Sequence, residues 1–274
     1  MSQPRFAVVV LLAVVLGGCS TPPPPEPVST ELPQLGLVGM WRVTAQGVEA
    51  DTWLRLENGA AILAPDCELD GGWIATETEF AAAIMAWSGE CTRGHAETAP
   101  WLTTATAYRS SGDGWELLAD DGSVTATLEY DGWPEVRDNT DPALVEPPTV
   151  TDELIANYAN PGTLTGGLVP ATYLTIVGRW IPDTPPTSSA PYLRFTDDKK
   201  VALSDGCNTS SSRWLITSGG SLVTTGSMTT LVDCDGVDVT GALSEAVTVG
   251  IARDGSLHLI DETGTDIGAY VRER

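Results

Sequence analysis

The side chains of this sequence that could carry out chemistry are its acidic residues, its two histidines and its five cysteines. Neighbouring carboxylates occur at three places: Asp120-Asp121, Asp197-Asp198, and Asp233 with Asp235 and Asp238. Two carboxylates facing each other across a cleft are the machinery of glycoside hydrolysis. Most of these aspartates, however, belong to glycine-containing turn sequences, where aspartate is favoured because its side chain bonds to the backbone. The sequence therefore predicts turns at these places and no catalytic residue.

Other catalytic and metal-binding signatures are missing from the sequence. It contains no serine-hydrolase elbow, no HExxH zinc motif and no phosphate-binding loop. The run "DCDGVD" lacks the ligand pattern of a calcium loop. His258 stands in an alternating segment between Leu257 and Leu259, which is typical of a lone surface or edge histidine, and His95 has no equivalent in the repeat described below. We expect no cofactor and no metal site.

The first cysteine, Cys19, ends an amino-terminal segment with three zones. Arg5 supplies a positive charge, residues 6–16 are apolar, and the sequence LGGC follows at 16–19. The apolar run is too short to cross a hydrocarbon core about 30 Å thick, but it has the size of a signal-peptide core. LGGC resembles the bacterial lipobox, whose cysteine is diacylated after cleavage, although Gly17 is less usual there than alanine or serine.

Residues 1–18 are therefore predicted to be a lipoprotein signal peptide and residues 19–34 a proline-rich tether. The expected protein is exported and held to a membrane by lipid on Cys19, facing the extracytoplasmic side of a bacterial cell envelope. Two acyl chains are enough for stable anchoring. The alternative is an ordinary secretory signal that happens to contain a cysteine.

The rest of the chain contains an internal repeat. The segment "LGLVGMWRV" at 35–43 matches "LTIVGRWIP" at 174–182, and "TWLRLENG" matches "PYLRFTDD". The series continues in order through four further pairs: Cys67 and Cys207, Trp73 and Trp214, Cys91 and Cys234, and Asp113-Gly114 and Asp254-Gly255. An ordered series of this length predicts a duplicated domain whose two copies differ in loop length.

The four cysteines of the repeat can pair in three ways. Their equivalence favours disulfides Cys67–Cys91 and Cys207–Cys234, and export would place them in an oxidising compartment where disulfides persist. The alternatives are free buried thiols or a zinc site built from all four cysteines. Zinc sites favour cysteine pairs separated by two to four residues, and the sequence has none.

The second repeat carries several motifs in a characteristic order. They are an opening "LTIVGRW", then "YLRF", the turn Gly206-Cys207-Asn208, Met228-Thr229 before Cys234, and a closing hairpin at 254–272. In this it resembles the META domain, also called the HslJ-like domain. The first repeat is a degraded version, because Glu68 stands at the place of the asparagine and no Met-Thr precedes Cys91. The family tends to carry a helix before the last hairpin, but the glycine, valine and threonine content there predicts a short or irregular one.

Strand signals predict a mainly β fold. Segments such as "YLRFTD", "VTATLEY" and "LHLID" alternate apolar and polar residues between turn signals. We expect two META-like domains, each a small antiparallel sheet curled into a partly open barrel with at most a short helix. The expected boundaries are 35–133 for the degraded domain, 134–171 for a linker with one helical candidate, "TDELIANYA", and 172–274 for the second domain.

Charge and aromatic content limit the possible partners. A formal net charge of −23 would repel a phosphate backbone, so we expect no nucleic-acid binding. Four of the nine tryptophans fall at repeated positions, which favours core packing. The five in the first repeat alone could add core volume or line a groove: Trp53, Trp87, Trp101, Trp115 and Trp133.

The function that these features indicate is non-enzymatic. The resemblance implies a binding or structural role in the cell envelope, with a loose association with envelope stress or secretion and an envelope protein as partner. The alternative is an extracellular binding module that takes a small apolar ligand in an open barrel mouth.

Overall fold

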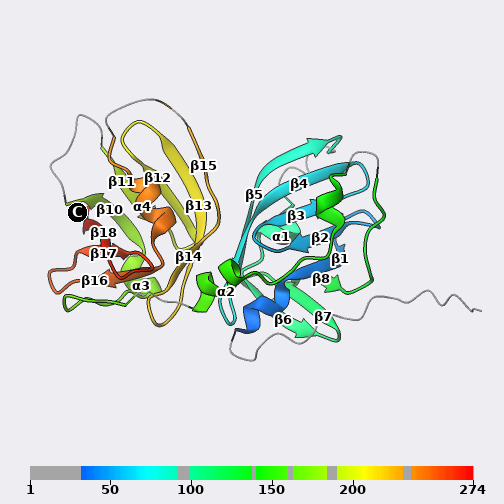
Figure 1. Ribbon diagram of the computed structural model, residues 1–274, viewed down its shortest axis with the longest axis horizontal. Helices are drawn as coiled ribbons and strands as arrows, with labels where there is room; N and C mark the ends of the chain where they lie inside the picture. Colours follow the sequence, from blue (N-terminus) through cyan, green and yellow to red (C-terminus); the bar gives the residue numbers. More distant parts are fainter. Residues whose placement is uncertain are drawn as a thin grey trace, which may run out of the picture.

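The chain folds into two antiparallel β-sheets, one formed by each half of the sequence (Figure 1). The computed structural model describes residues 32–91, 99–137, 140–159, 163–183, 190–230, 232 and 236–273. Strand residues greatly outnumber helical residues among them, which confirms the expected mainly β fold. No helix in these ranges is long and apolar enough to cross a membrane.

The first sheet has eight strands in the order β5-β4-β3-β2-β1-β8-β7-β6. The 3-10 helix η1 (Pro33–Leu37) precedes it, and the short helix α1 (Pro100–Thr103) lies between β5 and β6 in the chain. Its strands are β1 (Gly39–Ala45), β2 (Trp53–Leu56), β3 (Ala60–Leu63), β4 (Cys67–Ala75), β5 (Phe80–Gly89), β6 (Ala107–Ser111), β7 (Gly114–Leu118) and β8 (Val124–Glu129).

The second sheet repeats this order as β14-β13-β12-β11-β10-β18-β17-β16, with β9 outside β16 and β15 paired to β13. In both sheets the first strand therefore lies between the second and the last, as a duplicated domain requires. Its strands are β9 (Val169–Pro170), β10 (Gly178–Pro182), β11 (Tyr192–Phe195), β12 (Lys200–Ser204), β13 (Thr209–Ile216), β14 (Leu222–Thr224), β15 (Met228–Thr229), β16 (Thr248–Ile251), β17 (Leu257–Ile260) and β18 (Asp266–Arg272).

Both sheets curl until their edges touch. A single bridge between Glu79 and Ala107 joins the chain at β5 to β6, the two edge strands of the first sheet. The bridge between Ser221 and Thr248 joins the chain at β14 to β16, beyond the short pairing of β16 with β9 at Gly250 and Ile251. Because each contact is only one bridge wide, each domain is a partly open barrel rather than a closed one.

The repeated tryptophans fill equivalent places. In the first domain the Trp41 Nε1–H donates to the Leu37 carbonyl at 2.8 Å, and in the second the Trp180 Nε1–H donates to the Ile176 carbonyl at 2.7 Å. Ile176 ends the short helix α3 (Tyr173–Ile176), as Leu37 ends η1. Trp73 and Trp214 are also buried, so all four repeated tryptophans pack in the cores as predicted.

The connection between the sheets contains regular structure. It includes the 3-10 helix η2 (Pro142–Val145) and the helix α2 (Asp152–Ala159), which coincides with the predicted helical candidate. The end of the expected linker forms β9, which pairs with β16 and so belongs to the second sheet. The short helix predicted before the last hairpin is α4 (Val239–Glu245), and the Asp238 side chain caps it by accepting from the Gly241 N–H at 2.7 Å.

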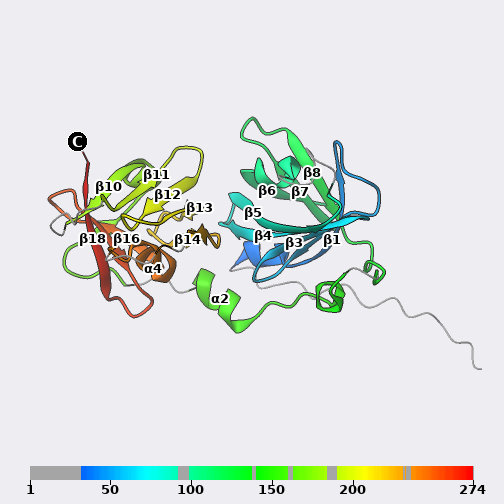
Figure 2. The ribbon, with the colours of Figure 1, turned by 90° about the horizontal axis from the view of Figure 1, so that it is seen from above.

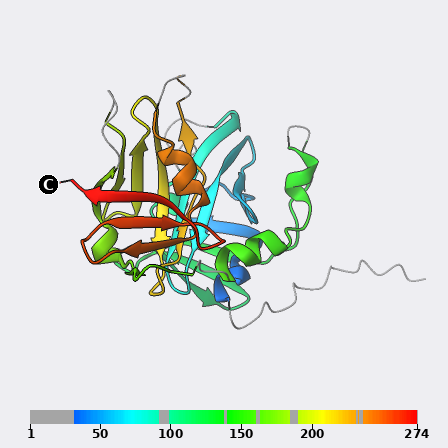
Figure 3. The same ribbon diagram turned by 60° about the vertical axis from the view of Figure 1, so that its left-hand side comes forward.

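The two domains pack against each other through β4 and β5 on one side and β13 and β14 on the other (Figure 2). Ile74, Ala81 and Leu215 form a small buried cluster at this contact. The backbones approach closely, because a Cβ atom placed on Gly72 would lie 2.9 Å from Thr225 Cβ. Figures 2 and 3 both place α2 at the junction of the sheets, where the Tyr158 hydroxyl accepts from the Ala75 N–H at 3.3 Å.

Candidate functional site

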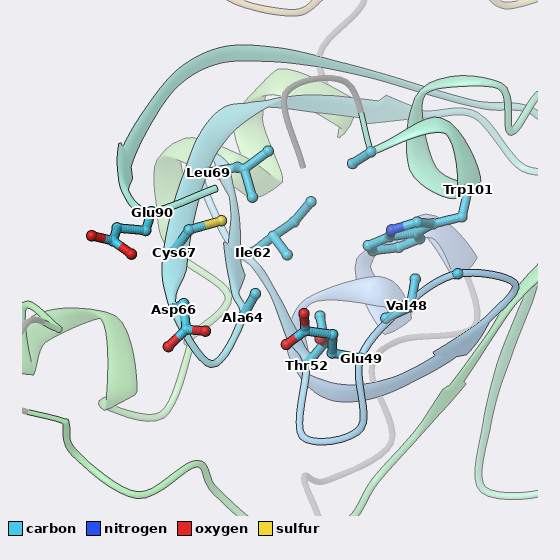
Figure 4. Close-up of a pocket in the computed structure, with 12 residues that line it drawn as sticks. Val48, Glu49, Thr52, Ile62, Ala64, Asp66, Cys67, Leu69, Glu90 and Trp101 are labelled. Carbon is cyan, nitrogen blue, oxygen red and sulfur yellow. The ribbon is translucent and has the colours of Figure 1, made fainter. Parts of the chain in front are cut away.

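A cavity of about 80 Å³ opens in the first barrel, between the β1–β2 loop, strands β3 and β4, and α1 (Figure 4). Ile62 of β3 and Leu69 of β4 are directly paired in the sheet, so their side chains lie on the same face. Trp101 of α1 faces them across the opening, and all three side chains are buried. The walls of the cavity are thus apolar.

The backbone takes an unusual conformation just before Trp101. Ala99, which also lines the cavity, has φ 34°, a region that non-glycine residues rarely adopt. Pro100 follows at the first position of α1, where its missing N–H costs no hydrogen bond. Strained backbone of this kind persists only when the surrounding packing holds it, and it is often found at binding sites.

Trp101 differs from the other buried tryptophans in its hydrogen bonding. The other five each donate the indole N–H to an oxygen at 2.7–3.1 Å: Trp41, Trp53, Trp73, Trp180 and Trp214. The Trp101 Nε1–H makes no hydrogen bond with any residue that the structure describes. This donor can therefore bond to water or to a molecule in the cavity.

The mouth of the cavity is acidic. Glu49, Asp66 and Glu90 line it. No described lining residue is a lysine or arginine, but Arg137 donates to the carbonyl of the lining residue Ala64 at 2.6 Å. Figure 4 shows the Glu49 and Asp66 carboxylates to one side of the opening and the Glu90 carboxylate pointing away from Trp101. Anionic molecules are therefore disfavoured here, and neutral or cationic ones are accepted.

The disulfide Cys67–Cys91 forms part of the cavity wall. Its Cα atoms are 5.0 Å apart, which confirms the first of the two predicted pairings. It ties the start of β4 to the chain that follows β5, so it keeps this side of the opening in place. Cys207 is also held in a disulfide, while its predicted partner Cys234 and the predicted lipid site Cys19 lie outside the described residues.

The Gly206-Cys207-Asn208 turn has a structural role. Gly206 has φ 104°, so it takes a conformation that side chains disfavour. The buried Asn208 side chain donates to Asp205 Oδ2 and to the Val232 carbonyl, both at 2.9 Å, and accepts from the Val232 N–H at 2.6 Å. The hydrogen bond from Asn208 is the main cause that lowers the pKa of Asp205. The motif thereby fastens the start of β13 to the segment after β15.

Met228 and Thr229 form β15 itself. The strand pairs with Ser210 and Ser211 of β13, and the Ser210 hydroxyl donates to the Met228 carbonyl at 3.0 Å. The Met228 side chain is 64% exposed, so it does not fill a core or a pocket. The motif residues of the second domain are thus brought together at one end of β13, away from the cavity in the first domain.

The neighbouring carboxylates stand in turns and caps, as expected. Asp121 accepts from the backbone and hydroxyl of Ser123, and these bonds lower its pKa. Asp238 caps α4, and Asp198 accepts from the Thr196 hydroxyl at 2.5 Å within the β11–β12 turn. Asp233 and Asp235 lie outside the described residues. Within the part of the chain that is described, no group of three or more potential ligands could hold a metal ion.

His258 is more connected than a lone surface histidine, so that interpretation is wrong. Its Nε2 lies 2.9 Å from Ser256 Oγ and its Nδ1 lies 2.7 Å from Asp266 Oδ2, an arrangement with the contacts of a hydrolase triad. Ser256 is buried, and its Oγ also lies 2.7 Å from Asp254 Oδ1, which competes for its single proton. The His258–Asp266 contact connects β17 to β18, and this structural role suits the group better than nucleophilic attack.

Comparisons with known protein families, with curated proteins and with solved structures found no match to this chain.

Sequence reasoning identified Trp101 only as one of five tryptophans that could line a groove. What distinguishes it is an unpartnered N–H, which depends on atoms from distant segments. The bonds of His258 had one sequence signal, the alternation of Ser256 and His258 on one face of a strand.

Proposed function

We propose that this protein is an exported, lipid-anchored cell-envelope protein that binds a small, mainly apolar molecule in the mouth of its first barrel. The main support for a ligand is the Trp101 indole, which faces Ile62 and Leu69 across the cavity and whose N–H has no hydrogen-bond partner among the described residues. It favours a ligand with an apolar body and one hydrogen-bond acceptor. The acidic mouth favours a ligand that is neutral or positively charged.

The size of the cavity limits the ligand. A cavity of about 80 Å³ is roughly half the ~150 Å³ known to hold benzene in an engineered protein. The bound part is therefore a group of a few heavy atoms, either a small molecule or the end of a larger one. The resemblance to META domains supports an envelope role, and the LGGC sequence supports anchoring through Cys19.

A non-enzymatic role rests on the chemistry of the cavity wall. Its acidic residues lie at the mouth, and the thiol of Cys67 is engaged in a disulfide. No described lining residue is a histidine, lysine or arginine that could act as a partner base or an oxyanion donor there. Binding is the property that these side chains support.

The test follows the Trp101 indole proton by NMR during titration with 1-alkanols of increasing length. We expect a saturable shift of this signal, with affinity rising along the series until the cavity is full. Trp101→Phe keeps an aromatic wall but removes the donor, so it weakens alkanol binding. Trp87→Phe is the matched control, because Trp87 is 55% exposed on β5.

Shifts that are linear in alkanol concentration and equal for all indoles would reject the ligand site. The anchoring is tested separately by Cys19→Ala. We expect this variant to lose incorporation of labelled palmitate and to be released from membranes. Retention of the label in the variant would contradict lipid attachment at Cys19.

A further inference from the structure

A second and much larger hollow lies between the two domains. Its volume is about 1240 Å³, and it is lined from the first domain by the start of β5 and the chain around α1 and β7, and from the second by the β11–β12 turn and β13. Eight of its described lining residues are alanine or threonine, and seven are charged: Glu79, Asp120, Asp197, Asp198, Lys199, Lys200 and Arg213. We call it the interdomain groove.

The groove brings together three positive and four negative side chains. The chain has only two lysines, Lys199 and Lys200, and both line it together with Arg213. Lys200 on β12 is directly opposite Arg213 on β13. Two like charges opposed across a sheet are destabilising. Because Glu79, Asp120, Asp197 and Asp198 also line the groove, the question is which of its cations these carboxylates leave unpaired.

The two lysines are already compensated. Lys199 forms an ion pair with Glu79 of the first domain, and its ammonium lies 4.7 Å from the centre of the Tyr173 ring. Lys199 does this from a left-handed backbone conformation, φ 60°, which lysine rarely adopts. Lys200 pairs with Asp198 at 2.6 Å, an exposed pair that an incoming anion can displace.

Arg213 differs from both lysines, because it has no bonded partner among the described residues. Its side chain makes no hydrogen bond or ion pair with any described residue, and its Nε is buried without an acceptor. Arg55 and Arg179 also have an Nε without a hydrogen-bond acceptor, but each has an ion pair, with Glu57 and Glu273 respectively. Burial lowers the pKa of Arg213, as expected for a guanidinium that water solvates poorly.

An unpaired, partly buried guanidinium is costly, because its lost hydration is not replaced. The planar fork of arginine matches the two oxygens of a carboxylate or phosphate group. The groove is open to solvent at this point and is large enough for such a group together with the rest of its molecule. Asp198 is near enough to stabilise the charge of Arg213 but does not bond to it.

We propose that the interdomain groove binds an anionic ligand through Arg213 and Lys200, with a carboxylate or phosphate group seated between them. The Lys199–Glu79 ion pair connects the two walls of the groove and so helps to fix the distance between them. This site is separate from the cavity in the first barrel.

The test uses the full chain and two probes, inorganic phosphate and succinate, titrated by calorimetry and by NMR of the Arg213 Nε–H. We expect saturable binding of at least one probe and a shift of the Arg213 signal. Arg213→Gln should weaken binding at least about tenfold, because a hydrogen bond to a charged group is lost. Lys200→Gln should weaken it less.

Arg194→Gln is the matched control, since Arg194 lies on the neighbouring strand β11, is exposed and does not line the groove. We expect it to bind both probes as the parent does. Preference for phosphate over succinate would identify a phosphate-bearing ligand, and the reverse a carboxylate. Absence of saturable binding, or equal losses in Arg213→Gln and Arg194→Gln, would overturn the site.

Discussion

At the scale of single residues, the Asn208 side chain makes four hydrogen bonds, more than any other side chain described in the second domain. It joins Asp205, Thr230 and Val232, which come from two separate segments of the chain. Buried amides of this kind specify one arrangement because every alternative leaves a donor or acceptor unpaired. The carboxylates of Asp121 and Asp238, in contrast, each serve only a local turn or cap.

We predict that Asn208→Ala lowers the free energy of unfolding by about 1–3 kcal/mol, because it leaves the Val232 N–H and carbonyl without partners. Urea unfolding followed by tryptophan fluorescence measures the change. Asn157→Ala, at an exposed position of α2, is the control and should change stability by less than about 0.5 kcal/mol. Equal values for the two variants would show that the network adds nothing.

The same residue controls a pH effect. The folded state lowers the pKa of Asp205 below its ordinary value of 3.8, mainly through the hydrogen bond from Asn208. A group whose folded pKa is lowered contributes stability that is present above its unfolded pKa and is lost as the pH falls through the folded one. We predict that Asn208→Ala raises the pKa of Asp205, as measured by NMR titration, and that the variant loses less stability on acidification below that value. An unchanged Asp205 titration would contradict this.

At the scale of elements, the same strand order is built with different edge strands in the two halves. The first domain has one long strand, β5, where the second has β14 and β15 separated by Thr225, Gly226 and Ser227. A Cβ on Gly226 would lie 3.3 Å from the Met85 side chain of β5. The gap between β14 and β15 therefore lies where the first domain packs against the second.

The disulfide Cys67–Cys91 connects two such elements, and its sequence separation is 24 residues. We predict that replacing both cysteines by serine costs roughly 3–4 kcal/mol of stability, because the unfolded chain regains that loop's freedom. Thermal unfolding under non-reducing conditions measures it. Parent and variant should become similar once both are reduced, because reductant also breaks the disulfide of Cys207. A variant as stable as the oxidised parent would contradict the prediction.

At the scale of the whole molecule, the two domains are held by a small apolar contact, by α2 and by the Lys199–Glu79 ion pair. Burial raises the pKa of Tyr158 on α2 to about 12. Since its folded pKa is raised, its contribution to stability is complete below the ordinary value of 10.0 and is lost as the pH rises through the folded value. The junction is therefore expected to weaken in strong alkali.

We predict that Lys199 and Glu79 stabilise the domain arrangement by about 1 kcal/mol, measured as the coupling energy of a double-mutant cycle with Lys199→Gln and Glu79→Gln. Small-angle scattering of the single variants should show a broader distribution of domain arrangements. Lys199→Asn is the informative comparison, because asparagine tolerates the left-handed conformation and relieves its strain while losing the ion pair. A coupling energy of zero would mean that the apolar contact alone holds the domains.

The sequence was sufficient for the features that depend on local pattern. Alternating segments predicted the strands, and the ordered matches from Trp41 and Trp180 onwards predicted two copies of one sheet, as the common strand order confirms. The equivalence of the cysteines predicted Cys67–Cys91. These features depend on neighbours along the chain or on a repeat, both of which can be read directly.

Only the tertiary structure decided which side chains lack partners and which surfaces meet. Leu35 and Leu174 are equivalent in the repeat, yet the first is buried and the second is 84% exposed. Trp101 and Arg213 resemble other tryptophans and arginines in sequence, but their unpaired N–H groups set them apart. Whether a donor finds an acceptor depends on atoms from segments far apart in the chain, and these distances exist only once the two barrels have folded and packed together.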